Sequence, residues 1–252
     1  MGISELSETQ QPFTIRRFMG GSRTLRRFQN RMREPFCPLC KSHRVTPYFE
    51  DRWRPYLQCD CCQLVFVPTE FHLSLEREKA EYDLHQNSPH DPKYRGFLNR
   101  LYEPMQAVLS KHSRGLDFGC GPGPTLSVML TEAGHEVDLY DPFYTNALKN
   151  IVDHRNPVVH QPYDFITASE VIEHLREPWM ELDRLWSLLK PNGVLGIMTK
   201  RVRDPASFAQ WHYKNDRTHI SFFSVTTFQW LAEKWSAGLD FHGEDVVLMS
   251  KQ

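Results

Sequence analysis

"LDFGCGPGPT", residues 116–125, joins a short apolar run to a segment of helical pattern. Gly119, Gly121 and Gly123 alternate there with other residues, and Asp117 lies two positions before the first glycine. Glycine has no Cβ, so a loop this rich in glycine lets a ligand approach the main chain. After the first strand of a parallel α/β sheet, such a loop lies at the carboxyl edge, where ligands bind.

The rest of the chain alternates between strand and helix patterns. Short apolar runs predict strands at 135–141, 163–168 and 194–200. Periodic segments predict helices at 68–84, 92–111, 124–134, 145–153, 176–193 and 226–238. Residues 239–250 predict a terminal hairpin. This order predicts an α/β fold with a mostly parallel sheet.

The loop does not match the dinucleotide-binding pattern G-x-G-x-x-G. The sixth position is Pro124 when counted from Gly119, and Leu126 when counted from Gly121, whereas the pattern needs glycine or alanine there. Pro122 and Pro124 also remove two N–H donors that a pyrophosphate would need. A phosphate ligand at this loop is therefore disfavoured.

The loop instead resembles motif I of the class I S-adenosylmethionine (SAM) methyltransferases, D/E-x-G-x-G-x-G. Residues 163–175, "YDFITASEVIEHL", and 188–199, "LLKPNGVLGIMT", resemble further segments of that family. Over about residues 35–250, the chain resembles a bacterial group in which a zinc ribbon precedes a class I methyltransferase core. The resemblance implies a Rossmann-like, mostly parallel seven-stranded sheet with a C-terminal antiparallel hairpin, preceded by a small zinc-ribbon module and covering helices.

The resemblance also implies SAM as the cofactor. Asp141 would bind the ribose hydroxyls, whereas the nearby Asp138 lies inside the expected strand; a turn-forming role before Pro142 is the other interpretation of Asp141. Residues 156–162, the expected third strand, lack the acid that commonly contacts the adenine amino group in the family. The implied cofactor-binding residues are Asp117, Gly119, Cys120, Gly121, Gly123, Asp141, Pro142, Ser169 and Glu170.

Five of the six cysteines lie between residues 37 and 62. Cys37, Cys40, Cys59 and Cys62 form two C-x2-C pairs, which is zinc-ribbon spacing. Four thiolates complete a closed tetrahedron, so we expect a structural Zn2+ with no open coordination position. Disulfides or unpaired buried thiols are the alternative, and disulfides need an oxidising compartment. Cys61 is left over.

The acceptor side of the reaction is expected around "EVIEH", residues 170–174. If this segment is helical, Glu170, Glu173 and His174 share one face beside the strand end. With a later histidine, for which His219 serves, the pattern resembles two groups of metal-dependent relatives, the small-RNA 3′-end 2′-O-methyltransferases and the O-methyltransferases of ubiquinone synthesis. The same pattern occurs in methyltransferases with no reported metal, so a second divalent metal, a general base and a structural role all stay open. The candidate catalytic residues are Glu170, Glu173, His174 and His219, and the candidate pocket residues are His85, Asn87, Trp211, His212, Tyr213 and Asp216.

Charge is unevenly distributed along the chain. The first 62 residues contain 11 Lys and Arg against 6 Asp and Glu, and the remainder contains 19 against 25. Residues 12–33 contain seven arginines and no acid, which fits either a solvated tail or a nucleic-acid-binding arm. We expect a basic arm over 1–34, the zinc ribbon over 35–68, a helical lid or linker over 69–112 and the methyltransferase core over 113–252.

Three functions remain open from the sequence: a small-molecule methyltransferase, an RNA or DNA methyltransferase that docks through the ribbon and arm, and a non-catalytic module with the same fold. The acidic core favours the small molecule, since it repels phosphates. The loop and Asp141 argue against the non-catalytic module. No apolar window has the length of a membrane span and no secretory signal pattern is visible, so we expect a cytoplasmic protein without a membrane partner. The sequence predicts no oligomeric state.

Overall fold

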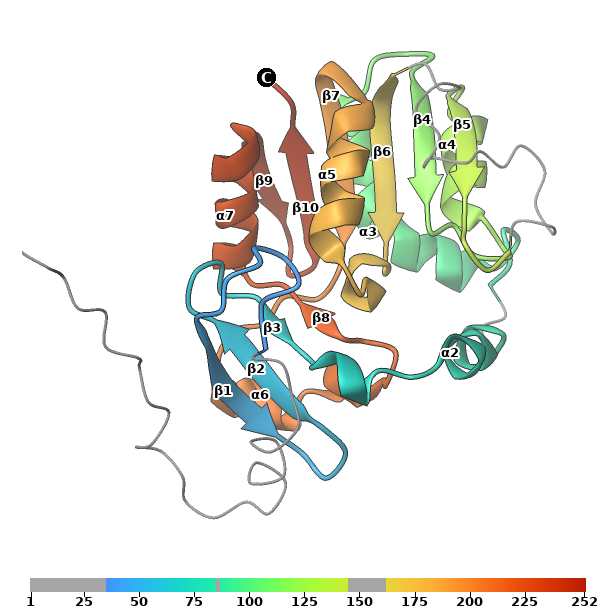
Figure 1. Cartoon of the computed structure of the whole chain (residues 1–252). Helices are drawn as coiled ribbons and strands as arrows, with labels where there is room; N and C mark the ends of the chain where they lie inside the picture. Colours follow the sequence, from blue (N-terminus) through green and yellow to red (C-terminus); the bar gives the residue numbers. More distant parts are fainter. Residues whose placement is uncertain (1–34, 85–86, 145–161) are drawn as a thin grey trace, which may run out of the picture. The chain divides into compact units, whose positions relative to one another are not determined.

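The computed structural model describes residues 35–84, 87–144 and 162–252 (Figure 1). Contacts divide the chain into two units, Met1–Pro35 and Phe36–Gln252, and the fold below is that of the second. The predicted arm over 1–34, the helix at 145–153 and His85 lie outside the described residues, as does the third strand except for Pro162. No helix in the described part is long and apolar enough to span a membrane.

The larger of two sheets has the strand order β5-β4-β6-β7-β10-β9. Neighbouring strands from β5 to β7 are parallel, and β10 pairs antiparallel with both β7 and β9. The prediction of a Rossmann-like sheet with a terminal antiparallel hairpin is confirmed, and the described residues supply six of its seven expected strands. The strands are β4 (Arg114–Phe118), β5 (Glu136–Tyr140), β6 (Tyr163–Ser169), β7 (Leu189–Met198), β9 (Gly238–His242) and β10 (Val246–Ser250).

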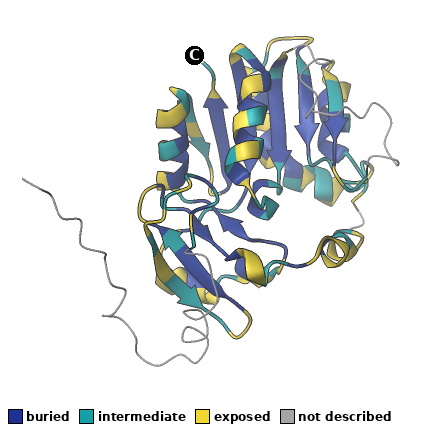
Figure 2. Ribbon diagram, in the orientation of Figure 1, coloured by how far each residue is buried: buried dark blue, intermediate teal, exposed yellow. Residues whose placement is uncertain are grey.

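Helices cover both faces of this sheet. On one face, α3 (Pro92–Val108) packs apolar side chains onto β7 and β10, and α4 (Thr125–Glu132) packs against α3 and β5. On the other, α5 (Pro178–Leu188) and α7 (Val225–Trp235) pack against the strands in a second buried cluster. The central strands are therefore buried along most of their length (Figure 2). Because burial fixes the strands, the loops at their carboxyl ends are held on a rigid frame.

The smaller sheet joins the cysteine-rich module to a segment between β7 and α7. Its order is β1-β2-β3-β8, and Val65 of β3 pairs with Phe222 of β8. Buried side chains of the module, including Leu57 and Leu64, belong to the same apolar cluster as the larger sheet. The module is therefore packed into the unit that contains the core. These strands are β1 (Val45–Glu50), β2 (Pro55–Cys59), β3 (Val65–Phe66) and β8 (Ser221–Phe222).

Three predicted helices differ in the structure. The helix expected from Pro68 is a short 3-10 turn, η1 (Thr69–Phe71), followed by α2 (Leu75–Tyr82), because the Ser74 hydroxyl accepts the Arg77 N–H and caps α2 there. The helix expected to stop at Pro-Asn-Gly ends at Leu188, and β7 begins at the next residue. The "EVIEH" segment is a single 3-10 turn, η2 (Ile172–His174), so Glu170 does not share a helical face with Glu173 and His174.

Candidate functional site

The glycine loop follows β4 at the carboxyl edge of the larger sheet. Gly119 and Gly121 have φ angles of 73° and 62°, a backbone region that favours glycine. A Cβ on Gly119 would lie 2.5 Å from a methyl group of Val171, whereas a Cβ on Gly121 would meet nothing within 4 Å. A Cβ on Gly123 would lie 2.2 Å from the main-chain oxygen of Asn87. The loop therefore has open space above Gly121 and close contacts on either side.

Asp117 lies beneath this loop and is fully enclosed. Its carboxylate accepts hydrogen bonds from the hydroxyls of Ser127 (2.5 Å) and Thr167 (2.8 Å). Burial raises the pKa of Asp117 to about 6. These bonds join β4 to α4 and β6, so Asp117 positions the loop from below. Sequence reasoning missed Ser127 and Thr167, because a single hydroxyl in an apolar segment carries no distinctive pattern.

Asp141 follows β5 and faces the loop from the neighbouring strand. One carboxylate oxygen accepts the Gly121 N–H at 2.9 Å, and the other accepts the Phe143 N–H at 2.9 Å. The Asp141 side chain therefore fits both interpretations: it stabilises the turn after β5, and it lies beside the glycine loop, where a carboxylate that binds ribose is expected. Asp138 lies within β5 and binds Arg114 and the Tyr163 hydroxyl instead.

The remaining predicted cofactor residues lie at the same edge. Cys120 is half-buried in the loop, Pro142 is exposed after β5, and Ser169 ends β6. Glu170 has a φ of 53° and donates its N–H to the Met198 oxygen at 2.7 Å. A non-glycine residue in this region stores strain, which is common at functional sites. Burial raises the pKa of Glu170 to about 7, and its Oε1 has no hydrogen-bond partner among the described residues.

Glu173, His174 and His219 form a cluster next to Glu170. One ligand atom from each lies within 4.8 Å of the others, and Glu170 is not part of this group. The Nδ1 atoms of His174 and His219 lie 3.2 Å and 2.7 Å from main-chain oxygens, of Thr218 and Tyr213 respectively. A carbonyl oxygen only accepts, so each Nδ1 donates and each Nε2 carries the ring's lone pair. Metal-binding histidines have this arrangement.

Glu173 is the buried carboxylate of the cluster. The Tyr213 hydroxyl donates to its Oε1 at 2.5 Å, and its Oε2 has no hydrogen-bond partner in the part of the chain that the structure describes. Burial, followed by the charge of Glu170, raises the pKa of Glu173 to about 8. One carboxylate and two imidazoles are a donor set that suits a divalent transition-metal ion.

The four cysteines of the two C-x2-C pairs also meet. Their Sγ atoms lie within 4.8 Å of one another, with 3.5 Å between Cys37 and Cys62 and 3.3 Å between Cys40 and Cys59. Zn–S bonds of about 2.3 Å in a tetrahedron place sulfurs about 3.8 Å apart. The geometry fits a tetrahedral metal ion, and all four thiols are free of disulfides. Cys61 is exposed and outside the cluster.

The cysteine module contacts the loop that carries Tyr213 through a buried arginine. Arg54, 4% exposed, donates hydrogen bonds of 2.9 Å to the main-chain oxygens of Lys214, Asp216 and Arg217. Sequence reasoning missed Arg54, because nothing in the sequence distinguishes a buried arginine between two strands from an exposed one. The side chain fixes the loop between Tyr213 and His219 from the module's side.

The comparisons with known proteins agree with this geometry. The chain matches the methyltransferase domain family over residues 90–241. A ubiquinone biosynthesis O-methyltransferase of Rhodopseudomonas palustris (strain BisA53) is 26% identical over 203 residues, which is 62% of this chain and 79% of the relative. A tRNA 5-carboxymethoxyuridine methyltransferase of Escherichia coli (strain K12) is 28% identical over 124 residues, which is 39% of this chain and 46% of the relative.

A solved O-methyltransferase family protein from Burkholderia thailandensis aligns with a TM-score of 0.47 and 19% identity, over 69% of this chain and 62% of that one. The chain spans less than half the length of several curated relatives that it matches. The family match covers more than half of the chain. The chain therefore belongs to the methyltransferase domain family and is a SAM-dependent methyltransferase.

Proposed function

We propose that this methyltransferase transfers the methyl group of SAM to a small-molecule acceptor at the carboxyl edge of the larger sheet. The observation that carries the proposal is a juxtaposition at this edge. The open glycine loop and Asp141 follow β4 and β5, Glu170, Glu173 and His174 follow β6, and His219 completes the cluster from the segment before β8. A cofactor held at the ends of β4 and β5 would lie next to an acceptor held at the end of β6, because β4 is the neighbour of both β5 and β6.

The residues at this edge fit SAM. The open space above Gly121 leaves room for a ligand against the main chain, and Asp141 has lone pairs beyond those used by its two N–H donors. Bound SAM would supply an electrophilic methyl group on a sulfonium. The protein's part is to hold donor and acceptor in line and to exclude water. Glu170, with a pKa of about 7, suits the removal of a proton from a hydroxyl acceptor near neutral pH.

We assign a divalent metal to the cluster of Glu173, His174 and His219. The two Nε2 lone pairs and the unpartnered Oε2 of Glu173 support this assignment. An ion held there would lower the pKa of an acceptor hydroxyl bound to it. Cys37, Cys40, Cys59 and Cys62 would hold a second, structural Zn2+, for which the closed set of four thiolates leaves no reactive position.

Two classes of acceptor are candidates, a small molecule and RNA. Relatives with both kinds of name match the chain, a ubiquinone biosynthesis O-methyltransferase and a tRNA methyltransferase. Beyond residue 62 the chain contains 25 acids against 19 basic residues, which opposes the approach of a polyanion. The small molecule is favoured for this reason.

The test uses SAM with an isotopically labelled methyl group. The protein is incubated with the small-molecule fraction and, separately, with the RNA fraction of one bacterial extract, and Asp141→Ala serves as the matched control. We expect label in the small-molecule fraction only, and much less with the control. Label in RNA would show that the nucleic-acid alternative is right.

A further inference from the structure

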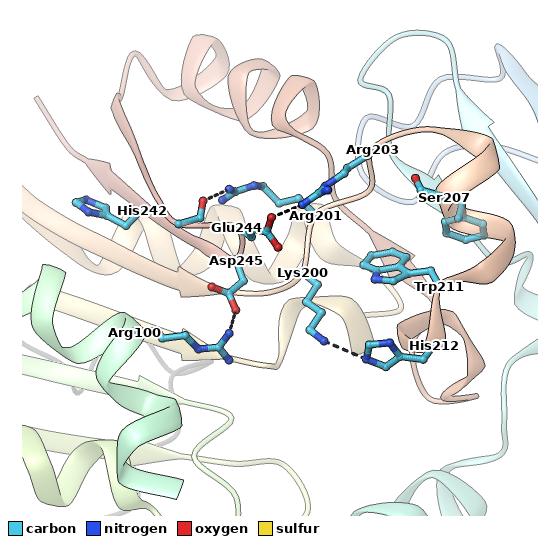
Figure 3. A pocket seen from close by; sticks show the side chains of 12 residues that line it. Arg100, Lys200, Arg201, Arg203, Ser207, Trp211, His212, His242, Glu244 and Asp245 are labelled. Carbon is cyan, nitrogen blue, oxygen red and sulfur yellow. Dashed lines mark hydrogen bonds and ion pairs between the residues drawn. The ribbon is translucent and has the colours of Figure 1, made fainter. Parts of the chain in front are cut away.

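A pocket lies beside the cluster, where β7 ends and β10 begins (Figure 3). Its volume is about 730 Å³, which is ample for a small organic molecule. Strands β7 and β10 are antiparallel neighbours, with Val246 opposite Met198, so the residues before β10 meet those after β7. The lining residues are Arg100, Lys200, Arg201, Arg203, Ser207, Phe208, Trp211, His212, His242, Gly243, Glu244 and Asp245.

The lining carries more positive than negative charge. Four of its residues are lysine or arginine and two are carboxylates. Arg100 pairs with Asp245, and Arg203 pairs with Glu244. Arg201 donates to main-chain oxygens of Gly243 and Val246, at 2.6 Å and 3.0 Å. The two carboxylates are therefore already paired, and the positive charges of Lys200 and Arg201 remain; the main-chain oxygens hold the Arg201 side chain in place.

Lys200 extends toward His212, with 3.1 Å between its Nζ and the His212 Nε2 (Figure 3). An ammonium group only donates, so the imidazole nitrogen accepts, and the Lys200 Nζ also lies 5.5 Å from the centroid of the Tyr213 ring; neither neighbour carries a negative charge that would neutralise the lysine. Lys200 forms no ion pair with a carboxylate of the described ranges 35–84, 87–144 and 162–252. A cation in a concave site attracts an anion, because the low-dielectric walls focus its field.

Part of the pocket lining is aromatic. The rings of Phe208 and Trp211 have centroids 5.8 Å apart, and Trp211 also packs on Tyr213, at 5.0 Å. Tyr213 is the residue that binds Glu173, so this aromatic part continues into the cluster. Glu170 donates its N–H to the oxygen of Met198, the last residue of β7, and Lys200 follows two residues later, so the pocket lies near Glu170.

We propose that this pocket binds an anionic group of the methyl acceptor, a carboxylate or a phosphate, through Lys200, while Trp211 packs against an adjoining apolar ring. The proposal rests on the proposed function, because it defines the acceptor of the same site. A nucleic-acid backbone fits less well, since the chain beyond residue 62 contains 25 acids against 19 basic residues, which opposes the approach of a polyanion.

The test measures binding of probes to the full chain. The probes are benzoate, phenyl phosphate and the neutral benzamide, each titrated by calorimetry in the presence of SAM, and a short single-stranded RNA is titrated separately. The variant is Lys200→Met. Lys111→Met is the control, because Lys111 is exposed before β4, at the opposite edge of the sheet.

We expect benzoate or phenyl phosphate to bind more tightly than benzamide, and Lys200→Met to weaken the anions about tenfold, as for loss of a charge-assisted hydrogen bond. The control should bind all probes as the wild type does. Preference for benzoate over phenyl phosphate assigns a carboxylate, and the reverse assigns a phosphate. Equal anion binding by Lys200→Met, or no preference for anions over benzamide, overturns the proposal.

Two further measurements, of RNA binding and of SAM affinity, separate this subsite from the alternatives. RNA binding that is tighter than probe binding and is weakened by Lys200→Met would contradict the small-molecule subsite in favour of a phosphate backbone. SAM affinity is measured on the same samples. If SAM binds to the wild type and to Lys200→Met alike, a failure of the anion test refutes this subsite alone, whereas absence of SAM binding refutes the proposed function itself.

Discussion

The Nη2 atom of Arg54 lies 2.9 Å from the main-chain oxygen of Lys214. This bond joins the hairpin of the cysteine module to the loop between Tyr213 and His219. His219 belongs to the cluster with Glu173 and His174, and the Tyr213 hydroxyl donates to Glu173. The pairing of β3 with β8 makes a second connection, just after His219. The module therefore directly supports the loop that carries Tyr213 and His219.

Replacement of Arg54 tests this connection. Arg54→Ala would remove the arginine donor from three main-chain oxygens, one of them in a buried bond and two in partly buried bonds, and an unsatisfied buried group costs about 1–3 kcal/mol. We expect the free energy of unfolding to fall by at least that amount and methyl transfer to fall more than SAM affinity. Chemical denaturation and calorimetry measure the two effects. Arg52→Ala, at an exposed neighbouring position, is the control; equal effects of both variants would contradict the account.

The zinc assignment predicts close to one equivalent of Zn2+ per chain, held by the four clustered thiols. Cys40→Ser should lower the zinc content and destabilise the module, because metal binding is coupled to folding. It should also reduce methyl transfer through the shared β3–β8 pairing. Cys61→Ser should change neither. Metal analysis decides the point, and a disulfide among these cysteines would refute it.

The second metal predicts binding of Mn2+ to protein whose cysteine site is kept filled with zinc. Loss of the free Mn2+ signal in electron paramagnetic resonance measures this binding. His219→Ala should weaken it at least about tenfold, since one imidazole ligand is lost. His242→Ala removes a histidine outside the cluster and should have no effect. Unchanged Mn2+ affinity in His219→Ala would leave the cluster with a general-base or structural role.

The buried Asp117 predicts a pH effect on stability. Burial raises its pKa from 3.8 to about 6, so this carboxyl favours the folded state below pH 4 and loses that advantage as the pH rises through 6. Asp117→Asn removes the titration. The free energy of unfolding of the variant, relative to wild type, should rise by roughly 3 kcal/mol between pH 4 and pH 7.5, from 1.36 kcal/mol per pKa unit. A difference that does not change with pH would contradict this assignment.

The periodicity of apolar residues predicted the sheet and the terminal hairpin correctly, and the spacing of the two C-x2-C pairs predicted the cysteine cluster. The glycine loop was predictable because Gly119 and Gly121 occupy backbone conformations that other residues rarely adopt. The "EVIEH" segment was not, because a strained residue, Glu170, follows the last residue of β6 and the tertiary contacts of Glu173 override a helical spacing. Arg54 and Tyr213 were not identified as supports of the site because their roles depend on partners far away in the sequence.

The most direct test of the central claim is a calorimetric titration of SAM into wild-type protein and Asp141→Ala, with Asp138→Asn as the control from the preceding strand. Asp141 faces the Gly121 amide, whereas Asp138 binds Arg114 and Tyr163 inside the sheet. Loss of hydrogen bonds to a carboxylate costs about 1.5–3 kcal/mol, so Asp141→Ala should bind SAM at least about tenfold more weakly, and the control should bind it as the wild type does. Equal SAM affinity of Asp141→Ala and the wild type would contradict the account.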